Sequence, residues 1–152
     1  MKSFEEHTRS NKVRKQRTSP ARAKALLQEA AKRYVFIESL EIKEENANYI
    51  VENVYDVLRE LIEAHMSFEG YKSYSHEANV AYLAEIDFRQ RDVYFFDELR
   101  KRRHGVKYYG KNVKLDYARK TLQFLQQHYE TLRKRVLSEL AMQEDIAWGL
   151  QQ

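Results

Sequence analysis

Apolar side chains recur every three or four residues through most of the chain, which is the spacing of an amphipathic α-helix. Ser19 followed by Pro20 is typical of a helix start, and Gly70 is typical of a helix end. No stretch alternates between apolar and polar residues as a half-buried strand does. The pattern therefore predicts five helices, over about residues 20–40, 45–69, 76–84, 93–107 and 114–140.

Two of these helices carry apolar residues in a pattern that constrains their packing. The helix over 45–69 is apolar on more than one side, so it should contact more than one neighbour. The helix over 114–140 repeats apolar residues every seven positions, as helices in bundles and coiled coils do; these are Leu115, Leu122, Tyr129 and Val136. With short connections, the sequence predicts an all-α, antiparallel, up-and-down bundle of four or five helices. In the helix over 45–69, His65 lies among the apolar residues, and we expect it to be a hydrogen-bonded core residue.

The two ends of the chain lack this pattern. Residues 1–18 are polar, basic and nearly free of apolar side chains, so we expect a flexible tail that does not fold. Residues 142–152 are expected to form a second tail, with Trp148 as its one anchor. The bundle would then occupy residues 19–141.

Composition excludes several classes of protein. The 152 residues suit one domain, and the absence of Cys excludes disulfides and thiolate zinc sites. Four Gly are too few for a glycine-rich phosphate loop. His76-Glu77 resembles the start of a zinc-binding helix, but no second His follows four residues later, so we expect neither a metal nor a cofactor. Without an apolar leader or a membrane-length apolar run, we expect a cytoplasmic protein that does not enter the membrane.

Charge is unevenly distributed along the chain. Residues 38–69 hold nine acidic and two basic side chains, whereas residues 100–120 hold nine basic side chains and one acidic. A further eight Lys and Arg lie within residues 1–24, beside two Glu. A basic segment of that density attracts phosphate-rich or acidic partners.

The segment from residue 97 to 110 contains the candidate chemistry. On a continuous helix Arg100, His104 and Tyr108 share one face, and Arg103 and Lys107 form the neighbouring ridge. Guanidinium groups donate two parallel hydrogen bonds to phosphate oxygens, and aromatic rings stack on bases. A nucleotide or RNA would therefore be bound by Arg100, Arg102, Arg103, Lys107 and Tyr109. The alternative is a basic face near a helix end that simply faces water.

The same segment reads Phe96-Asp97-x-Leu99-x3-Arg103-His104-x3-Tyr108, and it resembles the motif of the HEPN superfamily, which consists of small all-α prokaryotic domains. The stretch from Ala64 to His76, with aromatic and small residues, a Gly, a short loop and a Ser-His helix start, adds to the resemblance. The resemblance spans roughly residues 20–140.

The resemblance implies a homodimer whose two motif faces meet in a basic cleft. Many members are metal-independent ribonucleases with an Arg, a polar residue, three spacers and a His; others pair with a minimal nucleotidyltransferase in toxin–antitoxin modules. By position, Arg103 matches the motif Arg and His104 the polar residue, while Tyr108 stands where the motif His is expected. A phenol with a pKa of ~10 is a poor proton shuttle at neutral pH.

Three functions remain open from the sequence. The first is a non-catalytic or weakly catalytic subunit that binds a nucleotide or an RNA end and has a nucleotidyltransferase as its partner protein. The second is a toxin-like ribonuclease with Arg103, His104 and Tyr108 as its catalytic residues, in which His104 acts as general acid or base. The third is a dimeric structural protein whose basic segment only balances its acidic helix.

Overall fold

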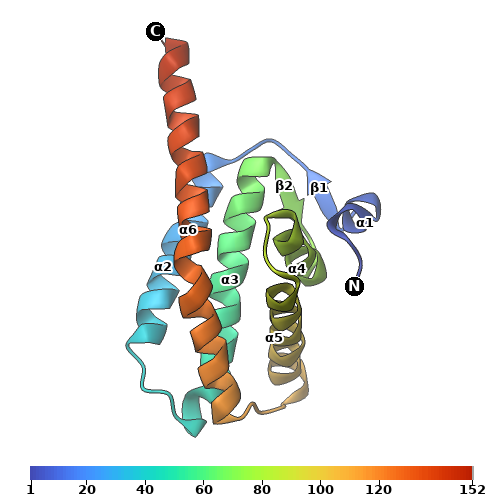
Figure 1. The fold of residues 1–152 in the computed structure, drawn as a ribbon, viewed down its shortest axis with the longest axis vertical. Coiled ribbons are helices and arrows are strands. Elements are labelled where there is room, and N and C mark those ends of the chain that lie inside the picture. Colours follow the sequence, from blue (N-terminus) through green and yellow to red (C-terminus); the bar gives the residue numbers. More distant parts are fainter. Residues whose placement is uncertain (152) are drawn as a thin grey trace.

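The computed structural model describes residues 1–151 and confirms the all-α bundle. Figure 1 shows the helices and strands, which are α1 (Phe4–Arg9), β1 (Val13–Lys15), α2 (Pro20–Glu38), the short 3-10 helix η1 (Glu44–Asn46), α3 (Ala47–Glu69), β2 (Tyr71–Ser73), α4 (His76–Glu85), α5 (Gln90–Tyr109) and α6 (Leu115–Gln151).

The long helices alternate in direction, with α3 between its neighbours (Figure 1). Helices α2 and α6 lie along one side of α3, and α4 and α5 follow one another along the other. Together α4 and α5 form one leg of the bundle, broken at residues 86–89. Asp87 at this break has φ +65°, a left-handed conformation that Asp tolerates better than most residues.

Helix α3 is central because its sequence is apolar on several sides. Fifteen of its 23 residues are buried, and Ile50, Val54, Leu61 and Ile62 have no exposed surface. Burial on this scale supplies most of the stabilisation of a bundle, since each large apolar side chain contributes about 1.5–3 kcal/mol. His65 is also buried, and its Nδ1 lies 2.7 Å from the Tyr82 hydroxyl, which confirms the expected core histidine.

The N-terminal residues fold, so the prediction of a flexible tail over residues 1–18 is wrong. Phe4 is buried between the rings of Tyr71 and Tyr82, at 5.2 and 5.0 Å between centroids. Strand β1 pairs antiparallel with β2, and Val13 is 1% exposed. A few apolar residues are enough to fold this segment, because pairing with β2 and packing on the existing core supply the remaining stabilisation. Neither contribution can be read from the local composition.

The C-terminal residues are also helical, contrary to the prediction of a tail over residues 142–152. Helix α6 continues to Gln151, although Leu140 is the last buried residue among its described side chains. Trp148 is 65% exposed and anchors nothing within the chain. The prediction took the end of the buried stripe as the end of the helix. Residues 141–148 contain no Gly or Pro to stop it, and most of them favour helix.

Gly70 joins the N-terminal segment to the end of α3. It has φ +77°, and its carbonyl accepts a hydrogen bond of 2.7 Å from the Gln16 amide. A Cβ on Gly70 would lie 2.8 Å from the Gln16 carbonyl oxygen. Both the turn and the close approach therefore require glycine.

We expect Gly70→Ala to destabilise the fold by about 1–3 kcal/mol, because it adds backbone strain and pushes residue 16 away. Gly110→Ala is the matched control, since Gly110 has φ +63° but nothing within 4 Å of an added Cβ. Urea unfolding of both variants measures the difference. If both variants lose the same free energy of unfolding, the close approach of residue 16 to Gly70 does not contribute to the effect.

Candidate functional site

A small cavity lies where α5 passes α3 and the start of α4. Its volume is about 40 Å³, and it is lined by Tyr55, His76, Arg100, Arg103 and His104. At roughly 10–15 Å³ for each water-sized atom, it has room for part of a phosphate group and not for a base. Three of the lining residues come from the basic segment of α5.

Arg103 is the buried cation of this cavity. Its side chain is 10% exposed, and its guanidinium carbon lies 5.1 Å from the centroid of the Tyr55 ring. One terminal nitrogen is 3.6 Å from the Asp56 carboxylate, which is beyond normal hydrogen-bond distance. The buried Nε has no hydrogen-bond partner among the described residues. The guanidinium is thus held in place with donors that an anion could use.

His76 faces the same cavity from the first turn of α4. The N-cap Ser75 accepts a hydrogen bond from the amide of residue 78 and so fixes the start of this helix. Nδ1 of His76 lies 2.7 Å from the Tyr55 hydroxyl. Partial burial lowers the pKa of His76, and the positive charges of Arg103 and Arg59 lower it further. Burial raises the pKa of Tyr55, so the phenol keeps its proton.

Arg100 and His104 complete the lining one helical turn apart. Arg100 is bound to Asp97 at 2.9 Å and lies 3.9 Å from Glu77 of α4. His104 is exposed at the mouth, with its ring centroid 4.8 Å from that of Tyr108 and 5.5 Å from that of Tyr109. Exposed rings beside this cavity could stack on a base whose phosphate enters it in part.

A row of carboxylates on α3 balances the arginines around the cavity. Glu60 is 4% exposed and accepts a hydrogen bond of 2.7 Å from Arg33 of α2. Burial raises the pKa of Glu60, while Arg33 and Arg59 act in the opposite direction. Arg59 also pairs with Glu63 at 3.0 Å. The cavity is therefore set in a largely neutralised network, and its spare positive charge is local to α5.

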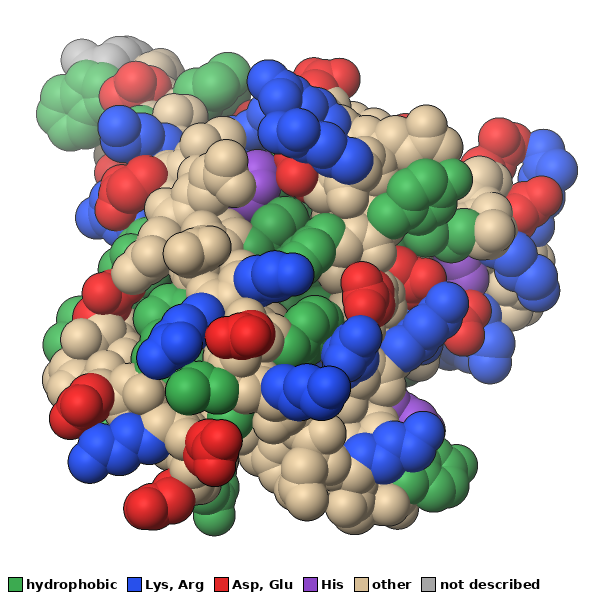
Figure 2. Space-filling model, turned by 60° about the horizontal axis from the view of Figure 1, so that its bottom comes forward, with side chains coloured by type: hydrophobic (Ala, Val, Ile, Leu, Met, Phe, Trp, Pro, Cys, Tyr) green, Lys and Arg blue, Asp and Glu red, His purple; other side chains and the backbone are tan. Residues whose placement is uncertain are grey.

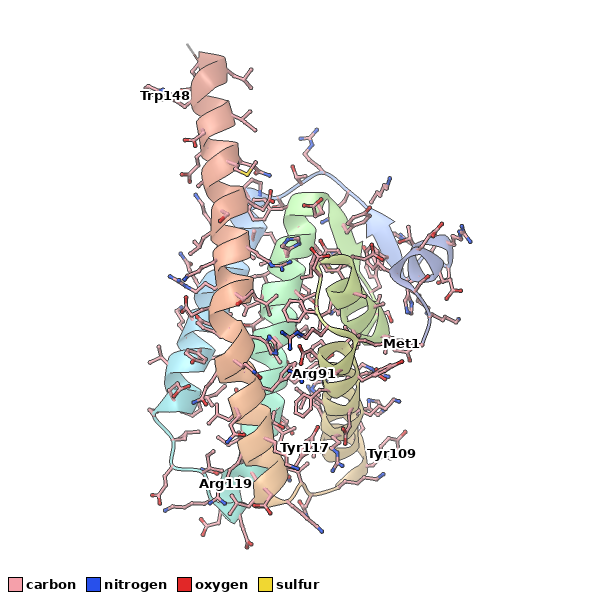
Figure 3. The ribbon with its side chains drawn as sticks, in the orientation of Figure 1. Met1, Arg91, Tyr109, Tyr117, Arg119 and Trp148 are labelled. Carbon is pink, nitrogen blue, oxygen red and sulfur yellow. The ribbon has the colours of Figure 1, made fainter. Side chains whose placement is uncertain are left out.

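The structure brings together Arg100, Arg103 and His104 of the predicted set, with Tyr108 and Tyr109 at the rim. Arg102 faces away, because it pairs with Glu98 at 2.9 Å and lies over the Tyr117 ring. Lys107 is exposed, with its ammonium 6.0 Å from the Tyr108 ring centroid. Figure 3 shows Tyr109 at the end of α5 and Tyr117 near the start of α6.

The expected basic surface is broken up by acidic side chains. Figure 2 turns the end of the bundle forward, and it shows Lys and Arg scattered over this face with Asp and Glu among them. Ion pairs within α5 account for part of this mixing, since Lys101 and Arg100 both contact Asp97. A ligand would therefore meet single cations rather than a uniform basic patch.

Sequence reasoning missed Tyr55, Asp56 and His76 as parts of the site. Tyr55 lies within the apolar helix predicted over residues 45–69, and His76 enters the sequence analysis only as a possible metal ligand and as part of a helix start. No local signal joins these residues to Arg103, which lies 27 or more positions later in the chain. Within residues 1–151, no three His, Asp or Glu side chains are placed to hold a metal ion.

Comparison with known proteins gives no identification. No family model, curated protein or solved structure matches this chain. Among residues 1–151, no helix is both long enough and apolar enough to span a bilayer.

We expect His76 to titrate below the usual histidine range, and Arg103→Gln to raise its pKa by removing a nearby positive charge. The unfolded chain binds this proton more readily, so His76 should also reduce stability as the pH falls through about 6.5 and below. NMR titration of the imidazole signals in both proteins measures the shift. Arg102→Gln is the control. An equal rise in the pKa of His76 in that variant would show that the charge of Arg103 does not act on His76 through its position in the cavity.

Proposed function

We propose that this protein binds the phosphate of a nucleotide or an RNA strand in the cavity between α3, α4 and α5. The protein would be a non-catalytic or weakly catalytic subunit, consistent with the HEPN resemblance. It would act in the cytoplasm as a homodimer, with a nucleotidyltransferase as its partner protein in a toxin–antitoxin-like module.

The observation that carries this proposal is the incomplete hydrogen bonding of Arg103. A buried guanidinium without good acceptors loses free energy, since an unmet hydrogen bond costs about 1–3 kcal/mol. A phosphate oxygen would supply the missing acceptor, and charge-assisted bonds to phosphate are among the strongest in proteins. Arg100 lines the same cavity and could add a second cation, while Tyr108 and Tyr109, whose rings lie near that of His104, would stack on the base.

Arg103→Gln should weaken binding of a fluorescent nucleotide or a short RNA about tenfold or more, because ~1.4 kcal/mol is a factor of ten in affinity. Arg102→Gln is the matched control: it removes the same charge from the adjacent residue, which faces Tyr117. Fluorescence anisotropy at fixed salt compares the two. An equal loss in both variants would show that binding depends on total charge and not on this cavity.

RNA cleavage is a second candidate, because two imidazoles line one cavity with Arg103. One imidazole would take the proton of a ribose 2′-hydroxyl, whose oxygen then attacks the neighbouring phosphorus. The other would donate a proton to the departing 5′-oxygen, leaving a 2′,3′-cyclic phosphate. The lowered pKa of His76 suits the role of the base, and its hydrogen bond with Tyr55 orients the ring.

In this second case metal-free cleavage of a mixed RNA should fall at least a hundredfold in both His76→Ala and His104→Ala, since a positioned acid or base contributes about 10²–10⁴-fold. Arg102→Gln should keep most of the activity. A wild-type protein that binds RNA through Arg103 but leaves it intact in chelator would eliminate the ribonuclease and retain the binding subunit.

A further inference from the structure

The C-terminal end of α6 extends beyond the bundle and exposes apolar side chains. Leu140 is the last of the described side chains of this helix to be buried, and the eleven residues from 141 to 151 extend about 16 Å further at 1.5 Å per residue. Figure 1 shows this extension rising past the ends of α2 and α3. Met142, Ile146, Trp148 and Leu150 on it are 57–84% exposed. Of the side chains that the structure describes from 141 to 151, none is buried.

One side of α6 carries a regular stripe. Leu137, Ala141, Glu144 and Trp148 follow one another at intervals of four, three and four residues, which places them on one face of the helix, as in a coiled-coil seam. Leu137 is already 39% exposed within the bundle. Figure 3 shows Trp148 projecting from the side of α6 on which α2 lies.

This stripe continues into a groove between α2 and α6. The groove has a volume of about 410 Å³; its apolar floor includes Leu27, Ala31, Leu137 and Ala141, and the charged residues Lys24, Arg133 and Glu144 border it. The two helices run antiparallel, with contacts from Lys24–Glu144 at 3.2 Å to Glu38–Gln126 at 3.0 Å. Val35 is 68% exposed near the end of the groove, beside Tyr34, whose ring stacks on Tyr129.

The charges along α6 are complementary to those of an identical helix that runs in the opposite direction. Arg133, Lys134 and Arg135 precede Leu137, the first residue of the stripe, while Glu139, Glu144 and Asp145 follow it. If two copies cross near residue 139, Arg133 of each lies opposite the partner's Glu144. Among the described residues, Arg133 and Glu144 make exposed ion pairs with Glu130 and Lys24, which contribute little and can exchange partners.

We propose that this protein pairs with a second copy of itself through the groove between α2 and α6, each projecting end of α6 lying antiparallel in the partner's groove. Trp148 of each copy then reaches the level of Tyr129 and covers the exposed Val35 of the other. Ala141, a small residue near the crossing, allows the helices to approach closely.

This surface is separate from the phosphate cavity, which lies between α3, α4 and α5. Pairing through α6 therefore does not depend on the proposed function, and its loss should leave the nucleotide affinity of each cavity unchanged. If the motif faces also pair, the two contacts close into an assembly of four chains when their two-fold axes are perpendicular, and loss of the α6 pairing then leaves two.

The test uses reversed charges in the full-length chain. Arg133→Glu places a carboxylate opposite the partner's Glu144, and Glu144→Lys places an ammonium group opposite the partner's Arg133. Each variant alone should therefore show half the wild-type mass by light scattering at about 20 μM. An equimolar mixture should recover the wild-type mass, because both contacts are attractive again between the two different variants.

Trp148→Ser should also halve the mass, whereas Tyr94→Ser, which removes an aromatic on α5 that is 56% exposed, should not. Circular dichroism confirms that each variant is helical. A wild-type protein that is monomeric at this concentration, a single variant that keeps the wild-type mass, or a mixture that stays at the lower mass would each overturn the proposal.

Discussion

The burial of charged groups along α3 is the constraint on which the remaining structure depends. This helix is covered on most sides because its sequence is apolar on most sides, yet it also carries Asp56, Glu60 and Glu63. A buried carboxylate is strongly destabilising without a positive partner. Arg33 of α2 contacts Glu60, and Arg103 of α5 approaches Asp56, so the same row of carboxylates fixes the position of a helix on either side.

This constraint also shapes the candidate site. Arg103 is drawn inward by Asp56 and Tyr55, but at 3.6 Å the carboxylate does not complete its hydrogen bonds. The contact with Asp56 is the kind of charge balance that a purely structural basic segment would make. Charge balance alone does not require hydrogen-bond donors of Arg103 without partners in residues 1–151 or two imidazoles beside them. These features support the proposed binding of a phosphate.

The site could be predicted in part. The basic segment of α5 indicated a phosphate ligand, and helical spacing correctly placed Arg100 and His104 together. The same reasoning included Arg102 and Lys107, because spacing alone does not say which ridge meets a neighbouring helix. Helical spacing could not identify Tyr55 and His76, because their positions near Arg103 depend on how α3, α4 and α5 pack. Their local patterns, an apolar stripe and a helix start, are common in any bundle.

The sequence by itself determined the five helices from residue 20 onward, their order and the all-α bundle, because apolar spacing and caps act over a few residues. Ser19, Ser75 and Gly70 mark helix ends for reasons of backbone chemistry that apply wherever they occur. Tertiary structure decided that the N-terminal residues fold, whereas local helix propensity keeps the C-terminal end helical. Residues 1–15 fold because Phe4 and Val13 find an existing core and β2 supplies hydrogen bonds, whereas the end of α6 stays helical without any core beneath it. The folding of residues 1–15 depends on contacts between distant residues, which the local pattern of polar and apolar positions does not contain. The end of α6 depends instead on local helix propensity, which acts even where the apolar pattern has ended.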